Sequence, residues 1–223
     1  FIIHHKIVFP LFSFLLQMPG CDEWNLGYVR NFALIFSKSL GVTKVLFMDD
    51  DIHVENANLI EELFQSLNDY QFVGANINGL VDDSILGHIA TDVGIVNERM
   101  LSGGFMVFNP RTIDHFFLNN YNEDWIWLFL QLKEKKYLQS GEVCQELSDP
   151  LTNYKAKVMF QEFGEIALDG ILDLYKENSY DLLVQLPFWE RMLKERAEYL
   201  NTLHNVSVKN HYIEIIEHVK SNS

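Results

Sequence analysis

Stretches with helical spacing of apolar residues alternate along this chain with short, continuous apolar runs. The first helical pattern covers residues 26–40, with Asn25 as a suitable N-cap and Gly41 as a suitable C-terminal stop. Its apolar positions are Val29, Phe32, Ala33, Phe36 and Leu40. This spacing predicts an amphipathic helix whose apolar face lies against a core.

The next two stretches repeat the alternation of strand and helix. Residues 44–48 form a continuous apolar run that ends at three aspartates, which is typical of a central strand buried on both faces. Residues 56–69 have helical period and residues 71–75 resemble another strand. Helix, strand, helix and strand in this order predict an α/β sheet.

The remaining residues have a less regular pattern. Residues 76–101 are rich in Gly, Asn and Asp and predict a long functional loop, with a pair of edge strands as the alternative. Residues 105–108 predict a strand, and Pro110 is expected to open a helix that runs through Phe117. Asn122 is expected to cap a helix that begins at Glu123.

Two longer helical patterns, residues 152–176 and 187–204, make the last third of the chain mostly helical, while residues 212–220 are too short to classify. The composition changes near Asp149-Pro150. We therefore expect an α/β core over residues 1–149 and a helical extension over residues 150–223 that packs on it.

The first nineteen residues are strongly apolar, but Pro10 interrupts them before they reach the ~20 residues of a membrane-spanning helix. No small-residue cleavage site follows, so we expect neither a transmembrane segment nor a signal peptide, but a buried strand with its connection. Because the chain opens on Phe1, an earlier part of the natural protein is expected to be missing.

Composition and charge narrow the classes of function. The 223 residues are 48% hydrophobic and 22% charged, which is an ordinary globular composition. The formal net charge of −14 argues against a nucleic-acid partner, and an anionic ligand would need a local cation such as a metal ion. Cys21 and Cys144 cannot form a disulfide framework, so a cytoplasmic setting is expected.

The three aspartates that follow the apolar run are the main candidate chemistry. Adjacent carboxylates raise one another's pKa unless a cation lies among them. Alternate residues of an extended chain project to one side, so Asp49 and Asp51 can converge on one ion while Asp50 points elsewhere. Such oxygen ligands suit Mg²⁺ or Mn²⁺. The alternative is a solvated acidic loop.

Two further groups of residues suit a ligand site. Ser102, Gly103 and Gly104 would let backbone approach a ligand closely and donate N–H groups, although glycine pairs are also common in plain turns. Glu123 and Asp124 could simply complement the helix dipole. At least one of the tryptophans at positions 125 and 127 is expected in the core.

Four motifs, in order, resemble those of GT-A glycosyltransferases, especially the family 2 type. Residues 27–33 (GYVRNFA) resemble the Arg-Asn helix, and residues 45–51 (VLFMDDD) resemble the DxD strand. Residues 101–108 (LSGGFMVF) look like the loop and strand that line the donor-sugar pocket, and residues 121–127 (YNEDWIW) look like the ED motif. The resemblance covers roughly residues 25–130 and implies a Rossmann-like mixed sheet flanked by helices.

The resemblance also implies a function, the transfer of a sugar from a nucleotide-diphosphate donor to a hydroxyl acceptor. The acceptor would be a glycan, a lipid-linked group or a small molecule. Asp49 and Asp51 would hold Mn²⁺ or Mg²⁺ against the diphosphate, Asp50 would contact ribose or sugar, and Arg30 would bind the nucleotide. Ser102, Gly103 and Gly104 would line the donor pocket. In the Glu123-Asp124 pair, Asp124 would act as base in an inverting reaction.

Family members often add a histidine as a further metal ligand, for which His204, His211 and His218 are candidates and His211 is preferred. Only 48 residues precede Asp49, fewer than the family has, so its first nucleotide-contacting strand is expected to be missing. Without that strand the sequence does not predict which nucleotide the donor carries. An inactive fragment of such an enzyme is the alternative.

Two other classes of protein remain as alternatives. The first is a haloacid-dehalogenase-like, Mg²⁺-dependent phosphatase with Asp49 as nucleophile. Phosphatases of this class have a small hydroxyl residue or a valine at the position where this chain has His53. They also have a downstream lysine and acidic pair, which we do not find in the expected order. The second is a non-catalytic module that binds a sugar nucleotide.

Overall fold

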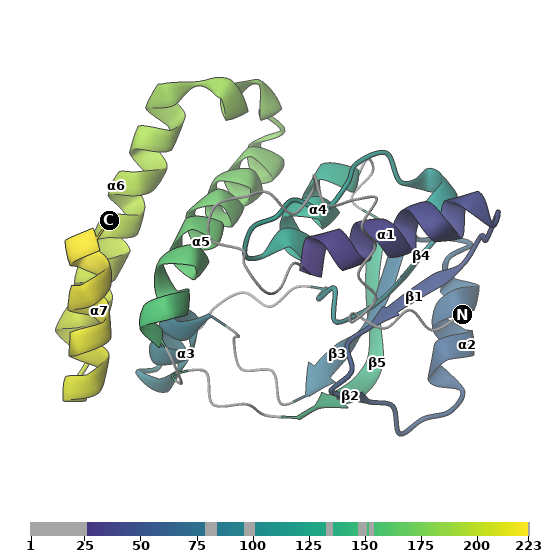
Figure 1. Ribbon diagram of the computed structural model, residues 1–223, viewed down its shortest axis with the longest axis horizontal. Coiled ribbons are helices and arrows are strands. Elements are labelled where there is room, and N and C mark those ends of the chain that lie inside the picture. Colours follow the sequence, from purple (N-terminus) through teal and green to yellow (C-terminus); the bar gives the residue numbers. More distant parts are fainter. Residues whose placement is uncertain are drawn as a thin grey trace. The chain divides into compact units, whose positions relative to one another are not determined.

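The computed structural model describes residues 26–78, 84–95, 101–132, 136–146, 151 and 154–222 (Figure 1). The helices and strands, in chain order, are α1 (Leu26–Ser39), β1 (Val45–Met48), β2 (Ile52–His53), α2 (Leu59–Ser66), β3 (Phe72–Asn78), α3 (Ile85–Asp92), β4 (Phe105–Phe108), η2 (Pro110–Thr112), α4 (Glu123–Gln131), β5 (Tyr137–Gln145), α5 (Tyr154–Glu177), η3 (Tyr180–Val184), α6 (Leu186–Val206) and α7 (Asn210–Asn222). The protein is a mixed α/β chain in which helices predominate.

The chain forms two compact units. The first takes the described residues up to 77 together with residues 101–119, 123–132 and 136–143. The second takes residue 78, residues 84–95, residues 120–122 and the described residues from 144 onward. The first unit contains the sheet with α1, α2 and α4. The second contains α3, α5, α6 and α7.

The first unit is built on a five-stranded sheet with the order β1-β4-β3-β5-β2. β4 lies antiparallel to β1, with Met48 opposite Phe105, and antiparallel to β3, with Phe72 opposite Phe108. Among the described residues β1 is therefore an edge strand, and the prediction that it is central and buried on both faces is wrong. Met48 is half-exposed, whereas every residue of β4 is buried.

One face of the sheet is covered by α2. Its buried residues Leu59 and Leu63 form one cluster with alternate strand residues, including Val73 of β3 and Phe105 and Val107 of β4. This alternation is the expected pattern for strands that present different side chains to their two faces.

The other face of the sheet carries an aromatic core centred on Trp127 of α4. Trp127 is fully buried, its ring stacks on Phe117 at 4.2 Å, and it lies edge-on to Phe72 and Phe108 at 5.3 Å each. Its indole N–H donates to the carbonyl oxygen of His115. The prediction that at least one of the paired tryptophans lies in the core is confirmed.

The predicted helix over residues 26–40 is confirmed as α1, but its buried face is not the expected one. The inward residues are Gly27, Tyr28, Arg30, Leu34 and Ser37, while the five expected apolar positions are only half-buried or, at Leu40, exposed. The helix ends as expected at Gly41, whose φ of +69° suits glycine and whose N–H donates to Lys38.

The helix expected from Pro110 through Phe117 is wrong beyond the short turn η2. Its backbone groups bond to side chains from distant parts of the chain instead. The Asn31 side chain bonds both the N–H and the C=O of Phe117, and Gln131 accepts from the N–H of Asp114. These partners satisfy the backbone in an extended course.

The loop expected over residues 76–101 contains the helix α3, which the sequence analysis missed. Ser84 caps it by accepting from the N–H of Gly87 at 2.9 Å, and its apolar residues are fully buried. β5 was likewise not predicted, and the unclassified residues near the C-terminus form α7. The strands over residues 71–75 and 105–108 and the helices over residues 56–69, 152–176 and 187–204 are confirmed within a few residues.

The second unit is held by apolar contacts among its helices and by two polar clusters. Ile85 and Ile89 of α3 pack with residues of α5, α6 and α7 in one buried cluster. Arg196 of α6 donates two hydrogen bonds to Glu162 of α5, both side chains being about nine-tenths buried. Near the start of α7, Lys209 pairs with Asp92 of α3 at 2.5 Å.

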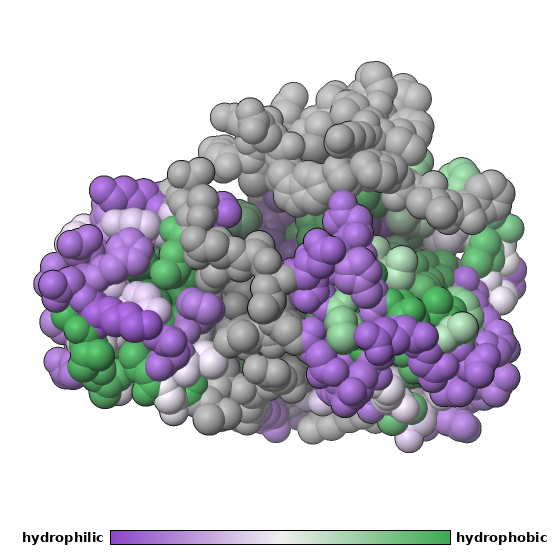
Figure 2. Space-filling view, turned by 90° about the horizontal axis from the view of Figure 1, so that it is seen from below, coloured by the Kyte–Doolittle hydropathy of each residue, from purple (hydrophilic) through white to green (hydrophobic). Residues whose placement is uncertain are grey.

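Hydrophilic residues cover most of the described surface seen in Figure 2, with smaller hydrophobic patches between them. None of the helices in the described parts of the chain is long and apolar enough to cross a membrane. The apolar segment over residues 1–19 and the expected boundary at Asp149-Pro150 both fall outside the described residues.

Candidate functional site

Asp49 stands directly after β1 and is fixed there by backbone hydrogen bonds. Its N–H donates to the carbonyl oxygen of Gly104 at 2.9 Å, which continues the pairing of β1 with the segment before β4. Its carbonyl oxygen accepts from the N–H of Ile52 at 3.2 Å, which closes a tight turn through Asp50 and Asp51. The carboxylate that follows the apolar strand is therefore held in a defined place.

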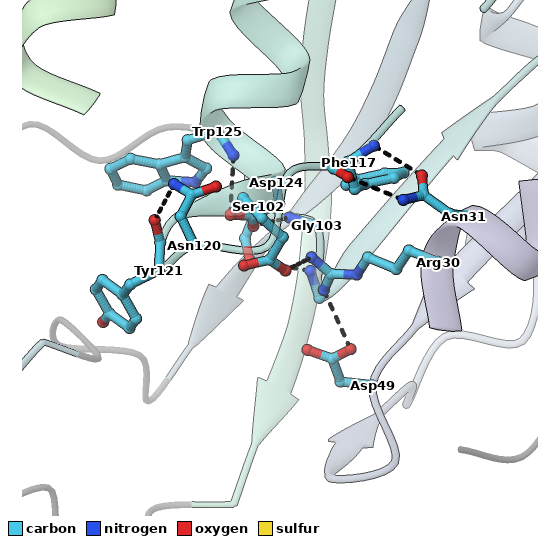
Figure 3. Close-up of polar contacts among 12 residues, drawn as sticks. Arg30, Asn31, Asp49, Ser102, Gly103, Phe117, Asn120, Tyr121, Asp124 and Trp125 are labelled. Atoms are coloured by element: carbon cyan, nitrogen blue, oxygen red, sulfur yellow. Dashed lines mark hydrogen bonds and ion pairs between the residues drawn. The ribbon is translucent and has the colours of Figure 1, made fainter. Parts of the chain in front are cut away.

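Arg30 projects from the inward face of α1 into the same region (Figure 3). Its side chain is only 6% exposed and forms ion pairs with Glu123 at 2.5 Å and with Asp49 at 3.5 Å. The guanidinium also lies 5.8 Å from the centre of the Phe117 ring. One cation thus joins the end of β1 to the start of α4.

Asn31, beside Arg30 on α1, is a structural member of this region that the sequence analysis did not assign. It donates to the carbonyl oxygen of Phe117 at 2.8 Å and accepts from the N–H of the same residue at 2.7 Å (Figure 3). This two-bond brace fixes α1 against the segment before α4. Its signal in the sequence is its position next to the candidate arginine.

The turn before β4 brings the glycines close to the carboxylates. A Cβ atom at Gly103 would lie 2.5 Å from Cβ of Asp124 and 2.8 Å from Nη1 of Arg30, and one at Gly104 would lie 2.9 Å from Oδ2 of Asp49. No larger residue fits these places without a shift of its neighbours. In the structure this turn lies close to protein side chains, and its close approach to a ligand stays a prediction.

The N–H groups of this turn also have acceptors within the protein. Gly103 donates to Oδ2 of Asp124 at 2.7 Å, and Gly104 donates to Oγ of Ser102 at 3.1 Å. The sequence analysis expected these N–H groups to face a ligand. In the structure they orient the Asp124 carboxylate and the Ser102 hydroxyl.

Glu123 and Asp124 begin α4, as predicted. Glu123 is buried against Arg30, whereas Asp124 is half-buried and also accepts from the N–H of Trp125 at 2.8 Å. The expected N-cap before them is wrong. Asn122 has a φ of +60°, outside the extended region usual for a cap, and its side chain bonds to Glu165.

Negative charge exceeds positive charge in this group of residues. Burial is the main factor that raises the pKa of Glu123, to about 8; Asp124 raises it further, and Arg30 opposes the shift. Burial also raises the pKa of Asp49 against the effect of Arg30, with contributions from Asp124 and Asp51. Burial lowers the pKa of Arg30, but Glu123, Asp124 and Asp49 raise it by more. Three carboxylates therefore surround one guanidinium, and Asp51 lies beside one of them, Asp49.

The carboxylates after β1 suit a divalent metal ion in part. Asp49 is 36% exposed and interacts electrostatically with Asp51, while Asp50 is exposed to solvent. Within the described ranges no group of three or more His, Cys, Asp and Glu side chains is placed to hold a metal. Mg²⁺ commonly takes only one or two protein carboxylates and completes its shell with water and phosphate oxygens, so these residues fit such an ion.

The histidines that were candidates for a further metal ligand belong to the second unit. His204 on α6 lies 3.5 Å from Glu217, while His211 and His218 on α7 pack edge-on against Tyr154. Their part in a metal site stays a prediction. His53 is exposed at the end of β2.

The buried carboxylate of Glu123 gives a prediction for stability against pH. Because its pKa is raised to about 8 in the folded state, the folded protein holds a proton that the unfolded chain has lost above about pH 4.5. The stability from this proton is complete below about pH 4.5 and is lost as the pH rises toward 8. The slope is at most about 1.4 kcal/mol per pH unit. Glu123→Gln is expected to flatten the decline, measured by urea unfolding with a chelator at pH 5, 6, 7 and 8.

The exposed Glu55 provides the control for that series. Glu55→Gln is expected to keep the wild-type slope, because it does not remove the buried carboxylate. Parallel curves for wild type and Glu123→Gln would contradict the raised pKa.

The structure therefore brings together residues from four separate segments: Arg30, Asp49, Ser102, Gly103, Gly104, Glu123 and Asp124. Asp51 lies beside this group, and Asp50 faces solvent. No protein-family model, curated protein or solved structure matches this chain.

Proposed function

We propose that this protein is a metal-dependent glycosyltransferase with a GT-A-like core, which transfers a sugar from a nucleotide-diphosphate donor to a hydroxyl acceptor. One observation carries the proposal. The Arg-Asn helix, the aspartates after β1, the glycine turn before β4 and the acidic pair that begins α4 converge in one group of contacts. Each of these motifs is weak alone, so their convergence is what supports a shared site.

In the proposed reaction Asp49 and Asp51 would hold Mn²⁺ or Mg²⁺, which neutralises the charge of the leaving diphosphate when bound. The role of Asp124 follows from its position. Two backbone N–H groups orient its carboxylate, and four lone-pair sites leave room for a third donor. It would accept the proton of the acceptor hydroxyl.

Bond changes at the anomeric carbon accompany that proton transfer. The acceptor oxygen forms its bond to this carbon, while the bond to the diphosphate oxygen breaks and its electron pair leaves with the diphosphate. Because attack and departure take place on opposite sides of the carbon, the configuration inverts. The products are the glycosylated acceptor and the nucleoside diphosphate.

We assign Arg30 a positioning role in this site, whereas the resemblance implied a contact with the nucleotide. At 6% exposure its guanidinium offers little surface to a ligand, and its contacts are with Glu123 and Asp49. Glu123 in turn holds the guanidinium at the start of α4, next to the proposed base.

The test is a screen of nucleotide-diphosphate sugars with Mn²⁺ or Mg²⁺, monitored by melting temperature and by release of nucleoside diphosphate. A cognate donor is expected to raise the melting temperature only when metal is present, because a ligand at about 100 times its Kd stabilises the native state by about 2.7 kcal/mol. Asp49→Asn should abolish the shift, and Asp69→Asn, an exposed aspartate after α2, should preserve it.

Two results would overturn the proposal. One is the lack of any shift or donor hydrolysis across the panel with either metal. The other is hydrolysis of p-nitrophenyl phosphate that requires Asp49, which is the activity expected of a phosphatase.

A further inference from the structure

The first unit has a pocket at the end of β4 that lies away from the candidate site. We call it the β4-end pocket, and its volume of about 510 Å³ lies within the range of about 300–1,000 Å³ that is usual for small-molecule sites. Asn109, which lines it, follows the last residue of β4, whereas Gly104 of the candidate site precedes the first. At about 3.4 Å per residue of strand, these two residues lie about 17 Å apart. The pocket is therefore separate from the proposed donor site.

The backbone around the β4-end pocket is held by Gln131, a fully buried residue at the end of α4. Its side-chain oxygen accepts from the N–H of Asp114, and its backbone carbonyl oxygen accepts from the side-chain amide of Gln71, each at 3.0 Å. The N–H of Gln71 donates in turn to the carbonyl oxygen of Lys136 at 3.0 Å. Asp114, Gln71 and Lys136 all line the pocket, so its walls are in place before a ligand binds.

Two neutral side chains of the lining have hydrogen-bonding groups available to a ligand. Oδ1 of Asn109 accepts from the N–H of Arg111 at 3.0 Å, but the N–H₂ group of the same side chain has no partner within the described part of the chain. The Tyr70 hydroxyl likewise has no partner among the residues that the structure describes. Both residues are half-buried, and Tyr70 packs with Leu67 at the edge of the cluster beneath α2. The pocket thus offers hydrogen-bond donors beside a fixed apolar wall.

The charges of the described lining residues cancel. Asp114 contributes one carboxylate, and Lys136 contributes one ammonium group. Because the whole chain has a formal net charge of −14, an anionic ligand is repelled by the protein's field as well as by Asp114, and Lys136 opposes a cation in the pocket itself. The pocket therefore favours a ligand without charge.

We propose that the β4-end pocket binds a neutral carbohydrate, a mono- or disaccharide. A hydroxyl group both donates and accepts hydrogen bonds, so a ring that carries several of them can bond to the Asn109 amide, the Tyr70 hydroxyl and the Asp114 carboxylate together. The C–H groups of such a ring suit the apolar wall of Leu67 and Tyr70. This inference does not rest on the proposed function, because none of the described lining residues belongs to the candidate site.

The test is an amide NMR titration of the full, isotope-labelled chain with glucose, galactose, mannose, N-acetylglucosamine and their disaccharides. A chelator is present and nucleotide is absent, so the proposed donor reaction is not required. The free amino acids alanine and glutamine serve as zwitterionic probes, and inorganic phosphate serves as the anionic probe. At least one carbohydrate is expected to bind with a Kd in the millimolar range or tighter, and the other probes are expected not to bind.

Two conservative variants test where the carbohydrate binds. Asn109→Asp keeps the oxygen that accepts from Arg111 but removes the N–H₂ donor, and Tyr70→Phe removes only the hydroxyl. Each is expected to raise the Kd by about 3- to 10-fold, the usual effect of losing one neutral hydrogen bond. Asn56→Asp is the matched control, because Oδ1 of the exposed Asn56 also accepts from the N–H two residues ahead at 3.0 Å. It should leave the Kd unchanged, as should Asp124→Asn in the candidate site.

The outcomes separate this inference from the proposed function. Carbohydrate binding that Asn109→Asp and Tyr70→Phe weaken supports the β4-end pocket even in a protein that turns over no donor. Binding that Asp124→Asn abolishes, or that neither pocket variant weakens, places the carbohydrate elsewhere and overturns the inference. Lack of binding by every carbohydrate overturns it too, as does binding of phosphate or an amino acid alone.

Discussion

Replacing Arg30 with methionine is expected to lower the free energy of unfolding by about 1.5–3 kcal/mol near pH 8, because the buried carboxyl group of Glu123, half protonated at that pH, and the carboxylate of Asp49 both lose a charged hydrogen-bond donor. The Glu123 carboxylate is 8% exposed and loses an ion pair of 2.5 Å, and Asp49 loses its nearest cation. In the variant Glu123 must remain charged without a partner or bind a proton. Binding a proton becomes less favourable as the pH rises, so the loss should be smaller at pH 5.5 than at pH 8.

Urea unfolding at these two pH values measures the effect. Arg191 provides the control, since it also contacts two carboxylates but is 43% exposed, and Arg191→Met should change stability little. The double variant Arg30→Met/Glu123→Gln should recover much of the loss, because the more deeply buried of the two carboxylates paired with Arg30 is then removed as well. A single variant within about 1 kcal/mol of wild type at pH 8 would show that the ion pair does not hold the site together.

The ion pair of Arg30 also explains why the sequence predicts the helix α1 but not its buried face. Helical spacing identified the helix, and hydrophobicity assigned the inward side to residues such as Phe32 and Phe36. The structure buries Arg30 and Ser37 instead. Arg30 has the carboxylates of Glu123 and Asp49 as partners inside the first unit, and the Ser37 hydroxyl donates to the carbonyl oxygen of Leu34. A buried cation is predictable only when its distant partners are known.

Strands and connections were predictable where local pattern determines them. The apolar runs before Asp49 and after Gly104 are strands, but their order in the sheet depends on pairing over long separations. The segment before α4 keeps an extended course because Asn31, Gln131 and Trp127 bind its backbone, and no local signal reports such partners.

The helix α3 is a different case, because its signal is present in the sequence. Ser84 stands as a cap before Ile85, Leu86, Ile89 and Ala90, which recur with helical spacing. Its short length and the Gly and Asp residues around it concealed the pattern. The cap and the spacing of α3 are local features, whereas the buried face of α1 and the course of the segment before α4 depend on tertiary contacts.

The members of the candidate site were predicted from motif order, but several of their contacts were not. Arg30 was expected to bind a nucleotide, and the N–H groups of Gly103 and Gly104 were expected to face a ligand. The structure gives each of them a protein partner. A motif indicates which residues gather, and only the three-dimensional contacts indicate whether a group is available to a ligand.

Replacing Asp124 with asparagine is expected to lower kcat for sugar transfer by about 10²- to 10⁴-fold, the usual contribution of a general base. The asparagine amide cannot accept the proton of the acceptor hydroxyl. Because Asp49 and Asp51 are unchanged, the metal-dependent stabilisation by the donor should persist, and the KM for the donor should change by less than about threefold. The measurements are initial rates of nucleoside diphosphate release with acceptor present, and melting temperature with donor and metal.

The geometry at Asp124 determines how that result must be controlled. Both of its carboxylate oxygens accept backbone N–H groups, one from Gly103 and one from Trp125, and asparagine has only one acceptor oxygen for the two. Some loss of stability is therefore expected, and rates must be compared at a temperature where the variant is folded. Asp69→Asn, the same change on an exposed residue, should leave kcat unaltered.

A folded Asp124→Asn protein with kcat within about tenfold of wild type contradicts the role of base. Loss of donor-dependent stabilisation together with turnover contradicts it too, because Asp124 would then act in donor binding.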